Sequence, residues 1–154
     1  MFWTSCSKIS KNGEWKYHKN WYEVDVKWVD GNELKYNLDA HTAELKAEYK
    51  NGVPIGMWIY ENAFTPQEGE KVIVEQIQIN FLDGIANGPF KYVLNDGNNQ
   101  VAANGEISAG FFDGTWIFEH KNETEIRNYQ DGILLELTTI EAGDSTHHFI
   151  FPHS

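Results

Sequence analysis

The stretch YKNGVPIGMWIY at residues 49–60 recurs twice along the chain, as FLDGIANGPFKY at 81–92 and as ISAGFFDGTWIF at 107–118. Each copy starts with a large apolar side chain, continues with a turn dipeptide that ends in Gly, and has a second Gly four residues later. Two aromatic rings, on either side of one other residue, end the copy. A short unit repeated in this way is typical of an architecture built by stacking copies of one supersecondary element.

That element is predicted to be a β-hairpin. Gly adopts positive φ without a steric penalty, so an Asn-Gly or Asp-Gly pair between apolar runs is a strong hairpin signal. Such pairs stand at Asn51-Gly52, Asp83-Gly84 and Asp131-Gly132. Beyond the turn the rings alternate with other residues and therefore share one face of a strand. The second Gly lies on that same face, where we expect its missing side chain to leave room for a neighbouring ring.

Weaker copies flank the three clear ones, which lie within residues 47–118. The copies at 11–39 and 126–140 keep the turn dipeptide or half of the unit, but Lys35 and Glu136 replace the second Gly. Terminal copies of a repeat usually deviate because they cap the stack. We therefore predict an all-β fold in which the whole chain forms one domain, an extended and twisted antiparallel meander of repeated hairpins.

The same residues resemble a known repeat family. The copy at 49–60, with its turn dipeptide, second Gly and Trp-spacer-Tyr ending, is similar to the MORN-repeat variant of bacterial YwqK-type proteins, and the copies at 81–92 and 107–118 fit the same pattern. The resemblance implies successive hairpins in an extended twisted sheet. It implies no catalytic residues, because the signature positions of the family are structural. It also implies a role in binding, since some relatives are described as antitoxins and MORN proteins generally act as scaffolds or membrane-adjacent adaptors.

The composition argues against several classes of function. The chain carries 23 acidic and 12 basic side chains, and its net charge of −11 would repel the phosphates of nucleic acids and of anionic lipids. No apolar run approaches the ~18 residues of a membrane span. A single cysteine rules out an internal disulfide. The same negative charge suits a basic protein partner.

The N-terminus leaves two locations open. Cys6 follows small residues, as in the cleavage box of a bacterial lipoprotein, but the basic and apolar segments of a lipoprotein signal are missing before it. We expect a cytoplasmic protein in which Cys6 is an ordinary free thiol. The alternative is a lipid anchor at Cys6 in the bacterial envelope, which requires that the true start lie upstream.

The aromatic ladder is the strongest candidate for a binding surface. The candidate binding residues are Trp15, Tyr17, Trp58, Tyr60, Tyr92 and Trp116. One interpretation is that these rings pack on one another across strands and form the core of an all-β fold. The other is that a single-layer sheet leaves part of this face open to a partner peptide or glycan.

No residue pattern predicts catalysis, a metal site or a cofactor. Asp83, Asp113 and Asp131 lie at or beside turns, where Asp is favoured for its local hydrogen bonds. Nothing marks two carboxyl groups as the pair that a glycosidase needs. His147 and His148 are adjacent, so on a strand they would point to opposite faces and would be poorly placed to chelate one ion.

The sequence therefore predicts a non-enzymatic protein-interaction module, of the kind represented by an acidic antitoxin, an immunity protein or a scaffold. Two alternatives stay open. One is a surface-attached lipoprotein module that binds glycans or peptides through the aromatic face. The other is an enzyme with a cleft beside the insertion at residues 61–80. No motif identifies the partner or the oligomeric state.

Overall fold

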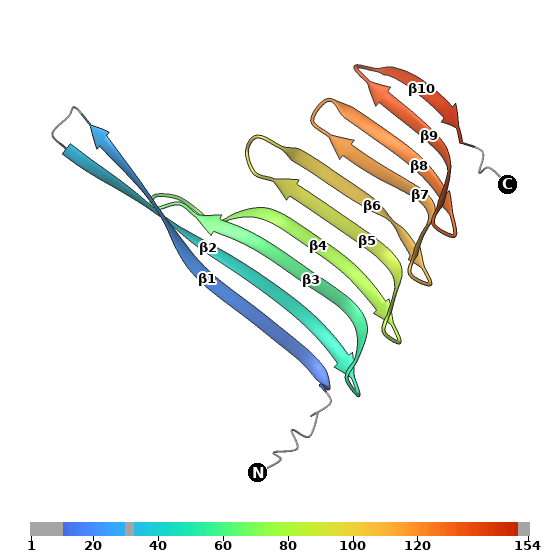
Figure 1. Cartoon of the computed structure of the whole chain (residues 1–154), viewed down its shortest axis with the longest axis horizontal. Coiled ribbons are helices and arrows are strands. Elements are labelled where there is room, and N and C mark those ends of the chain that lie inside the picture. The colour runs from blue at the N-terminus through green and yellow to red at the C-terminus, as the bar shows by residue number, and fades with distance from the viewer. Residues whose placement is uncertain (1–10, 30–32, 151–154) are drawn as a thin grey trace, which may run out of the picture.

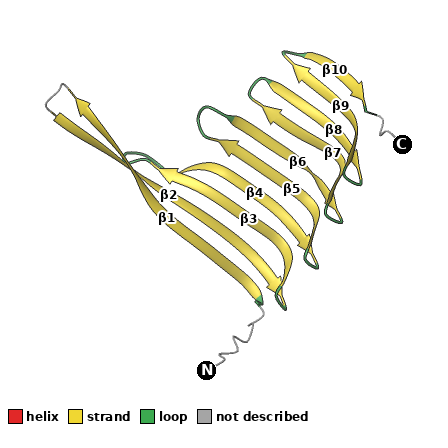
Figure 2. Cartoon of the chain, viewed as in Figure 1, coloured by secondary structure: helices red, strands yellow, loops and turns green. Residues whose placement is uncertain are grey.

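The computed structural model describes residues 11–29 and 33–150, with side chains described at 11–21 and 40–150. Within these ranges the protein is all β, and ten antiparallel strands form one open sheet in which each strand pairs with its neighbour in sequence (Figures 1 and 2). This confirms the predicted meander of hairpins. The strands are β1 (Gly13–Val29), β2 (Glu33–Lys50), β3 (Val53–Thr65), β4 (Val72–Leu82), β5 (Ile85–Asn95), β6 (Gln100–Ser108), β7 (Phe111–His120), β8 (Glu123–Gln130), β9 (Ile133–Glu141) and β10 (Asp144–Phe149). Cys6 lies outside the described residues.

Four two-residue turns line one edge of the sheet, the lower edge in Figure 1, which we call the turn edge. In each turn both residues have positive φ, from 48° to 51° at the first position and from 77° to 86° at the second. This is the type I′ geometry, whose twist matches that of the flanking strands. The turns are Asn51-Gly52, Asp83-Gly84, Ala109-Gly110 and Asp131-Gly132, so all three predicted turn signals are confirmed.

Hydrogen bonds between neighbouring turns hold the hairpins in register along the turn edge. The amide of each turn glycine donates to the carbonyl of the residue that stands two positions after the previous turn glycine. The pairs, each at 2.8 Å, are Gly84 N to Pro54 O, Gly110 N to Ala86 O and Gly132 N to Phe112 O. Gly52 N donates in the same way to Lys11 O at 2.7 Å, so the weak N-terminal copy stacks as the others do.

The second Gly of each clear copy lies in a β-bulge. Lys46 and Glu48 of β2 are two residues apart, but their partners on β3, Ile59 and Ile55, are four residues apart, so β3 contains two extra residues at this point. Gly56 has a φ of 68° at this bulge, and Gly88 (105°) and Gly114 (67°) stand at the same place in the next two copies. A bulge residue in this region of φ favours Gly because a Cβ would be strained there.

The reason we expected for this second Gly is wrong. A Cβ on Gly114 would meet nothing within 4 Å, and a Cβ on Gly56 would meet the Glu48 carboxylate and not a ring. The backbone angle, and not space for a ring, therefore selects Gly. In the last copy, Glu136 replaces the Gly, and the bulge in β9 contains only one extra residue.

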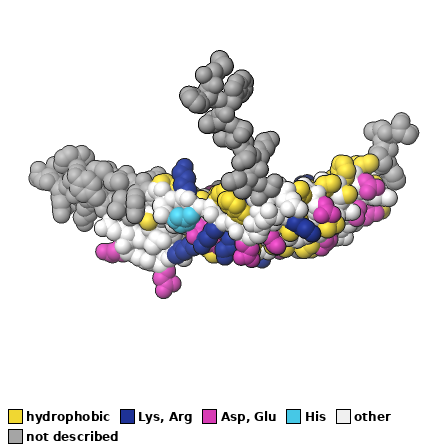
Figure 3. All heavy atoms as spheres, turned by 90° about the horizontal axis from the view of Figure 1, so that it is seen from below, with side chains coloured by type: hydrophobic (Ala, Val, Ile, Leu, Met, Phe, Trp, Pro, Cys, Tyr) yellow, Lys and Arg dark blue, Asp and Glu magenta, His cyan; other side chains and the backbone are white. Residues whose placement is uncertain are grey.

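The sheet is a single layer, so side chains pack across strands on its faces and not between layers. Seen from the turn edge, it is thin and curved, with charged and apolar side chains interspersed along it (Figure 3). Of the described residues, the buried ones are Ala47, Ala63, Ala103, Ile107 and Trp116. Both faces therefore reach solvent over most of the sheet.

Candidate interaction surface

Two rows of side chains run across the strands on one face of the sheet, which we call the aromatic face. Cross-strand pairing forms one row from Tyr17, Leu45, Tyr60, Ile77, Tyr92, Ala103 and Phe118. The second row, nearer the turn edge, consists of Trp15, Ala47, Trp58, Ile79, Phe90, Gly105 and Trp116. The fold thus brings all six predicted binding residues onto the same face.

The rings of the aromatic face differ in how much surface they present. Trp15 and Tyr17, on the edge strand β1, are 39% and 37% exposed. Trp116, on β7, is fully buried. The half-buried members of the predicted set are Trp58, Tyr60 and Tyr92. Five of the six predicted residues are therefore accessible to a ligand in this structure. Trp116 is not accessible and packs only against other residues of the sheet.

Trp116 is buried because neighbouring rings enclose it and a glycine lies beneath it. Its ring stacks on Phe112 with centroids 3.9 Å apart, and the Phe90 centroid is 5.3 Å away. A Cβ on Gly105 of β6 would overlap the indole ring, with three ring atoms at or within 2.5 Å. The indole Nε1 donates to Glu106 O at 3.0 Å, where β6 and β7 shift register. The ring therefore anchors β7 on β6.

Trp58 repeats this arrangement on β3 and β2. Its indole Nε1 donates to Glu48 O at 3.2 Å, and its ring lies 5.1 Å from Tyr49 and 4.9 Å from Phe81. Ala47, 3% exposed, is the small residue of the facing strand. In both copies a small residue stands eleven positions before the Trp. That spacing is a sequence signal for this packing, and it is visible only once the two strands are known to face each other.

Three rings surround the ammonium group of Lys11 at the β1 end of the aromatic face. Lys11 Nζ lies 5.1 Å from the Trp15 ring, 5.0 Å from the Tyr17 ring and 5.2 Å from the Tyr49 ring. It also donates a hydrogen bond to Tyr17 Oη at 2.5 Å. This bond lowers the pKa of Tyr17 and raises the pKa of Lys11. Lys11 stands at no signature position of the repeated unit, so the repeat pattern does not predict its role.

Several carboxylates lie close together on the part of the aromatic face formed by β8, β9 and β10. Glu141 of β9 is paired with Glu123 on one side and with Asp144 on the other. Hydrogen bonding with Glu141, followed by burial and by the charges of Glu141 and Glu125, raises the pKa of Glu123. Arg127 offsets part of this charge through its ion pair with Glu125. Like charges directly opposite each other destabilise a sheet, so a cation bound here would be stabilising.

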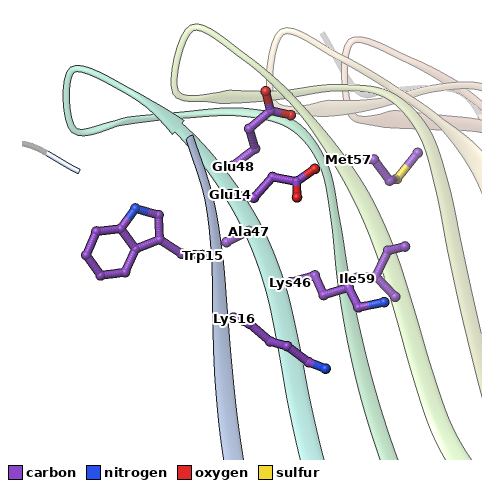
Figure 4. A pocket seen from close by; sticks show the side chains of 8 residues that line it. All are labelled: Glu14, Trp15, Lys16, Lys46, Ala47, Glu48, Met57 and Ile59. Atoms are coloured by element: carbon purple, nitrogen blue, oxygen red, sulfur yellow. The ribbon is translucent and has the colours of Figure 1, made fainter. Parts of the chain in front are cut away.

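The opposite face of the sheet is mixed in character. It carries a shallow hollow of about 480 Å³ beside β1, β2 and β3 (Figure 4). The side chains that Figure 4 shows on this side are Glu14, Lys16, Lys46, Glu48, Met57 and Ile59, whereas Trp15 points away from them. This face offers both signs of charge beside apolar groups and not a continuous row of rings.

The two C-terminal histidines lie on opposite faces, as the alternation predicts. His147 is in register with Thr138, and His148 is in register with Leu137. His147 Nε2 is 4.0 Å from Glu136 Oε2. Among the side chains described at 11–21 and 40–150, no group of three or more His, Cys, Asp or Glu is arranged to hold a metal ion.

Residues 61–80 comprise the end of β3, a loop at 66–71 and most of β4, and the loop lies at the edge opposite the turn edge (Figure 1). Lys71 Nζ lies 2.9 Å from Glu61 Oε1, and Gln76 Nε2 lies 3.4 Å from Glu61 Oε2. These contacts tie the returning strand to β3. An enzyme cleft beside the insertion stays a prediction.

Comparison of the chain with protein-family models, with curated proteins and with solved structures gives no match. The resemblance to MORN repeats therefore stays a prediction. No helix long and apolar enough to cross a membrane occurs in the part of the chain that the structure describes.

Proposed function

We propose that this protein is a non-enzymatic interaction module that binds a basic protein partner through its aromatic face. Such a module would serve as an antitoxin, an immunity protein or a scaffold. The observation that carries the proposal is the single-layer sheet. Its two rows of apolar and aromatic side chains lie across the strands, and no second layer of the described chain covers them.

The amount of exposed surface supports the proposal. On the aromatic face, Trp15 and Tyr17 are 39% and 37% exposed, and Phe112 is 38% exposed. Trp58, Tyr60 and Tyr92 are half-buried on the same face. Extended apolar surface on a monomer is expected to mark an interaction site.

The charge distribution supports a basic partner. The net charge of −11 would attract a basic protein over a distance and raise the rate of encounter. Glu123, Glu141 and Asp144 lie in one cross-strand row beside the rings, and the pKa of Glu123 is raised by Glu141. Lysine or arginine side chains of a partner would relieve that repulsion.

Affinity capture from a lysate of the source organism tests the proposal. With the full chain as bait, we expect one basic protein to be retained at ~0.05 M salt and released at ~0.5 M salt, because screening weakens the attraction between exposed charges. A bait in which Glu123 and Glu141 are both replaced by Gln should capture the same partner more slowly. Repeated recovery of no protein, or of an acidic partner that is insensitive to salt, would contradict the proposal.

A further inference from the structure

The ammonium group of Lys11 has an unusual environment for a lysine in so acidic a chain. The chain offers 23 carboxylate side chains and only 12 basic ones. Nevertheless, the contacts of Lys11 Nζ among the described residues are with the rings of Trp15, Tyr17 and Tyr49 and with the Tyr17 hydroxyl. The ammonium thus lies near the Trp15 and Tyr49 rings and at the hydroxyl edge of Tyr17. Proteins recognise alkylammonium groups by placing aromatic rings around them.

The sheet holds the backbones of the three ring residues, and the Tyr17 hydroxyl also accepts a hydrogen bond from Lys11. Trp15 and Tyr17 stand two residues apart on β1, and Tyr49 on β2 is paired with Gly13 of the same strand pair. The Trp15 indole Nε1 donates to Asn12 O at 3.1 Å, which fixes the ring. The three rings, which we call the cage, therefore project from backbone positions that do not depend on the Lys11 side chain.

Lys11 can leave the cage without disturbing the fold. Its carbonyl accepts the hydrogen bond from Gly52 N, so its backbone is fixed at the turn edge. Its side chain reaches the rings from that fixed point and can rotate away about its own bonds. The rings are open to solvent, since Trp15 is 39% exposed and Tyr17 is 37% exposed.

We propose that Trp15, Tyr17 and Tyr49 form a binding site for an alkylammonium group, and that Lys11 occupies this site in the free protein. The ligand in the complex is a lysine side chain of the basic partner, which displaces Lys11. This inference rests on the proposed function, because it gives the chemistry of the partner that the aromatic face binds.

Binding of a small cation tests the cage without the partner. The probe is choline chloride, its neutral isostere is 3,3-dimethylbutan-1-ol, and the readout is the shift of the Trp15 and Tyr49 backbone amides in ¹H–¹⁵N NMR spectra. Removing the resident cation with Lys11→Gln should strengthen choline binding about tenfold, because three ring contacts become available. The alcohol should bind Lys11→Gln at least about tenfold more weakly than choline does.

Two further variants complete the test. Lys19→Gln removes a lysine that lies over the Trp21 ring, at 5.7 Å, and should leave choline binding at the cage unchanged. The double variant Lys11→Gln/Tyr17→Leu should no longer bind choline at the cage. Dispersed amide signals in its spectrum would show that it is folded. Equal binding of choline and the alcohol, or no gain in Lys11→Gln, would overturn the cage. Failure of capture from the lysate with choline binding intact would instead overturn the proposed function.

Discussion

The replacement Gly105→Ala tests the packing that buries Trp116. Gly105 lies within β6, and it is the described glycine whose φ is outside the left-handed region, so its backbone would accept Ala. By backbone propensity alone, Ala in place of Gly in a strand would stabilise the protein by about 0.5–1 kcal/mol. The structure predicts the opposite sign, because the new Cβ would overlap the Trp116 indole.

The expected change in the free energy of unfolding follows from the contacts that the Trp116 indole would lose. Forcing an extra methyl group into a packed site costs about 1–3 kcal/mol. If the ring of Trp116 lifts, it also loses its hydrogen bond to Glu106 O (3.0 Å), which is worth about 1 kcal/mol. After the favourable propensity of Ala is subtracted, we expect the free energy of unfolding to fall by about 2 kcal/mol.

Urea unfolding followed by tryptophan fluorescence and by far-UV circular dichroism measures this change. The matched control is the same replacement in a Trp116→Leu background, where the smaller side chain removes the overlap and the cost of Ala should largely vanish. A Gly105→Ala protein as stable as the parent, or a cost that persists in the Trp116→Leu background, would refute the reasoning.

Three further outcomes are expected. Glu141 raises the pKa of Glu123 above its ordinary 4.5, so the two carboxylates destabilise the fold at pH 7, and this effect fades as the pH falls through the raised pKa. Glu141→Gln should therefore raise the Tm at pH 7 but not at pH 4, as scanning calorimetry would show. Lys11→Gln should raise the pKa of Tyr17 toward 10, its ordinary value, in a ¹³C NMR titration of the tyrosine rings, because the ammonium that lowers it is gone. Gly114→Ala should cost about 1–2 kcal/mol in urea unfolding through its positive φ alone, and Gly114→Asn should cost less, since Asn tolerates this conformation.

Much of the fold could be predicted because its signals are local. Asn51-Gly52 and Asp131-Gly132 determine where the chain reverses, and alternation of rings determines which residues share a face. The turn at Ala109-Gly110 is recognisable only by its place in the repeat, since an Ala-Gly pair is a weak turn signal. The two-residue register shift at Gly56 could not be predicted, because it depends on the pairing of β3 with β2.

The sequence predicted which rings share the candidate surface but not how exposed each ring is. All six predicted rings lie on one face, yet Trp116 is enclosed by Phe112, whereas Trp15 lies on the edge strand with a neighbour on one side only. Exposure thus depends on the neighbouring strands, which the sequence pattern does not specify. The Lys11 cage was missed for the same reason, because Tyr49 reaches it only through the pairing of β2 with β1.

Capture of the partner by face-specific variants tests the central claim most directly. Tyr60 and Ile59 are adjacent, half-buried residues of β3 that point to the aromatic face and to the opposite face respectively, and Tyr92 and Val93 form the same kind of pair on β5. With urea unfolding showing comparable stability, we predict that Tyr60→Ser and Tyr92→Ser lose the partner while Ile59→Ser and Val93→Ser retain it. Loss of the partner only in the Ile59 and Val93 variants would contradict the assignment of the aromatic face.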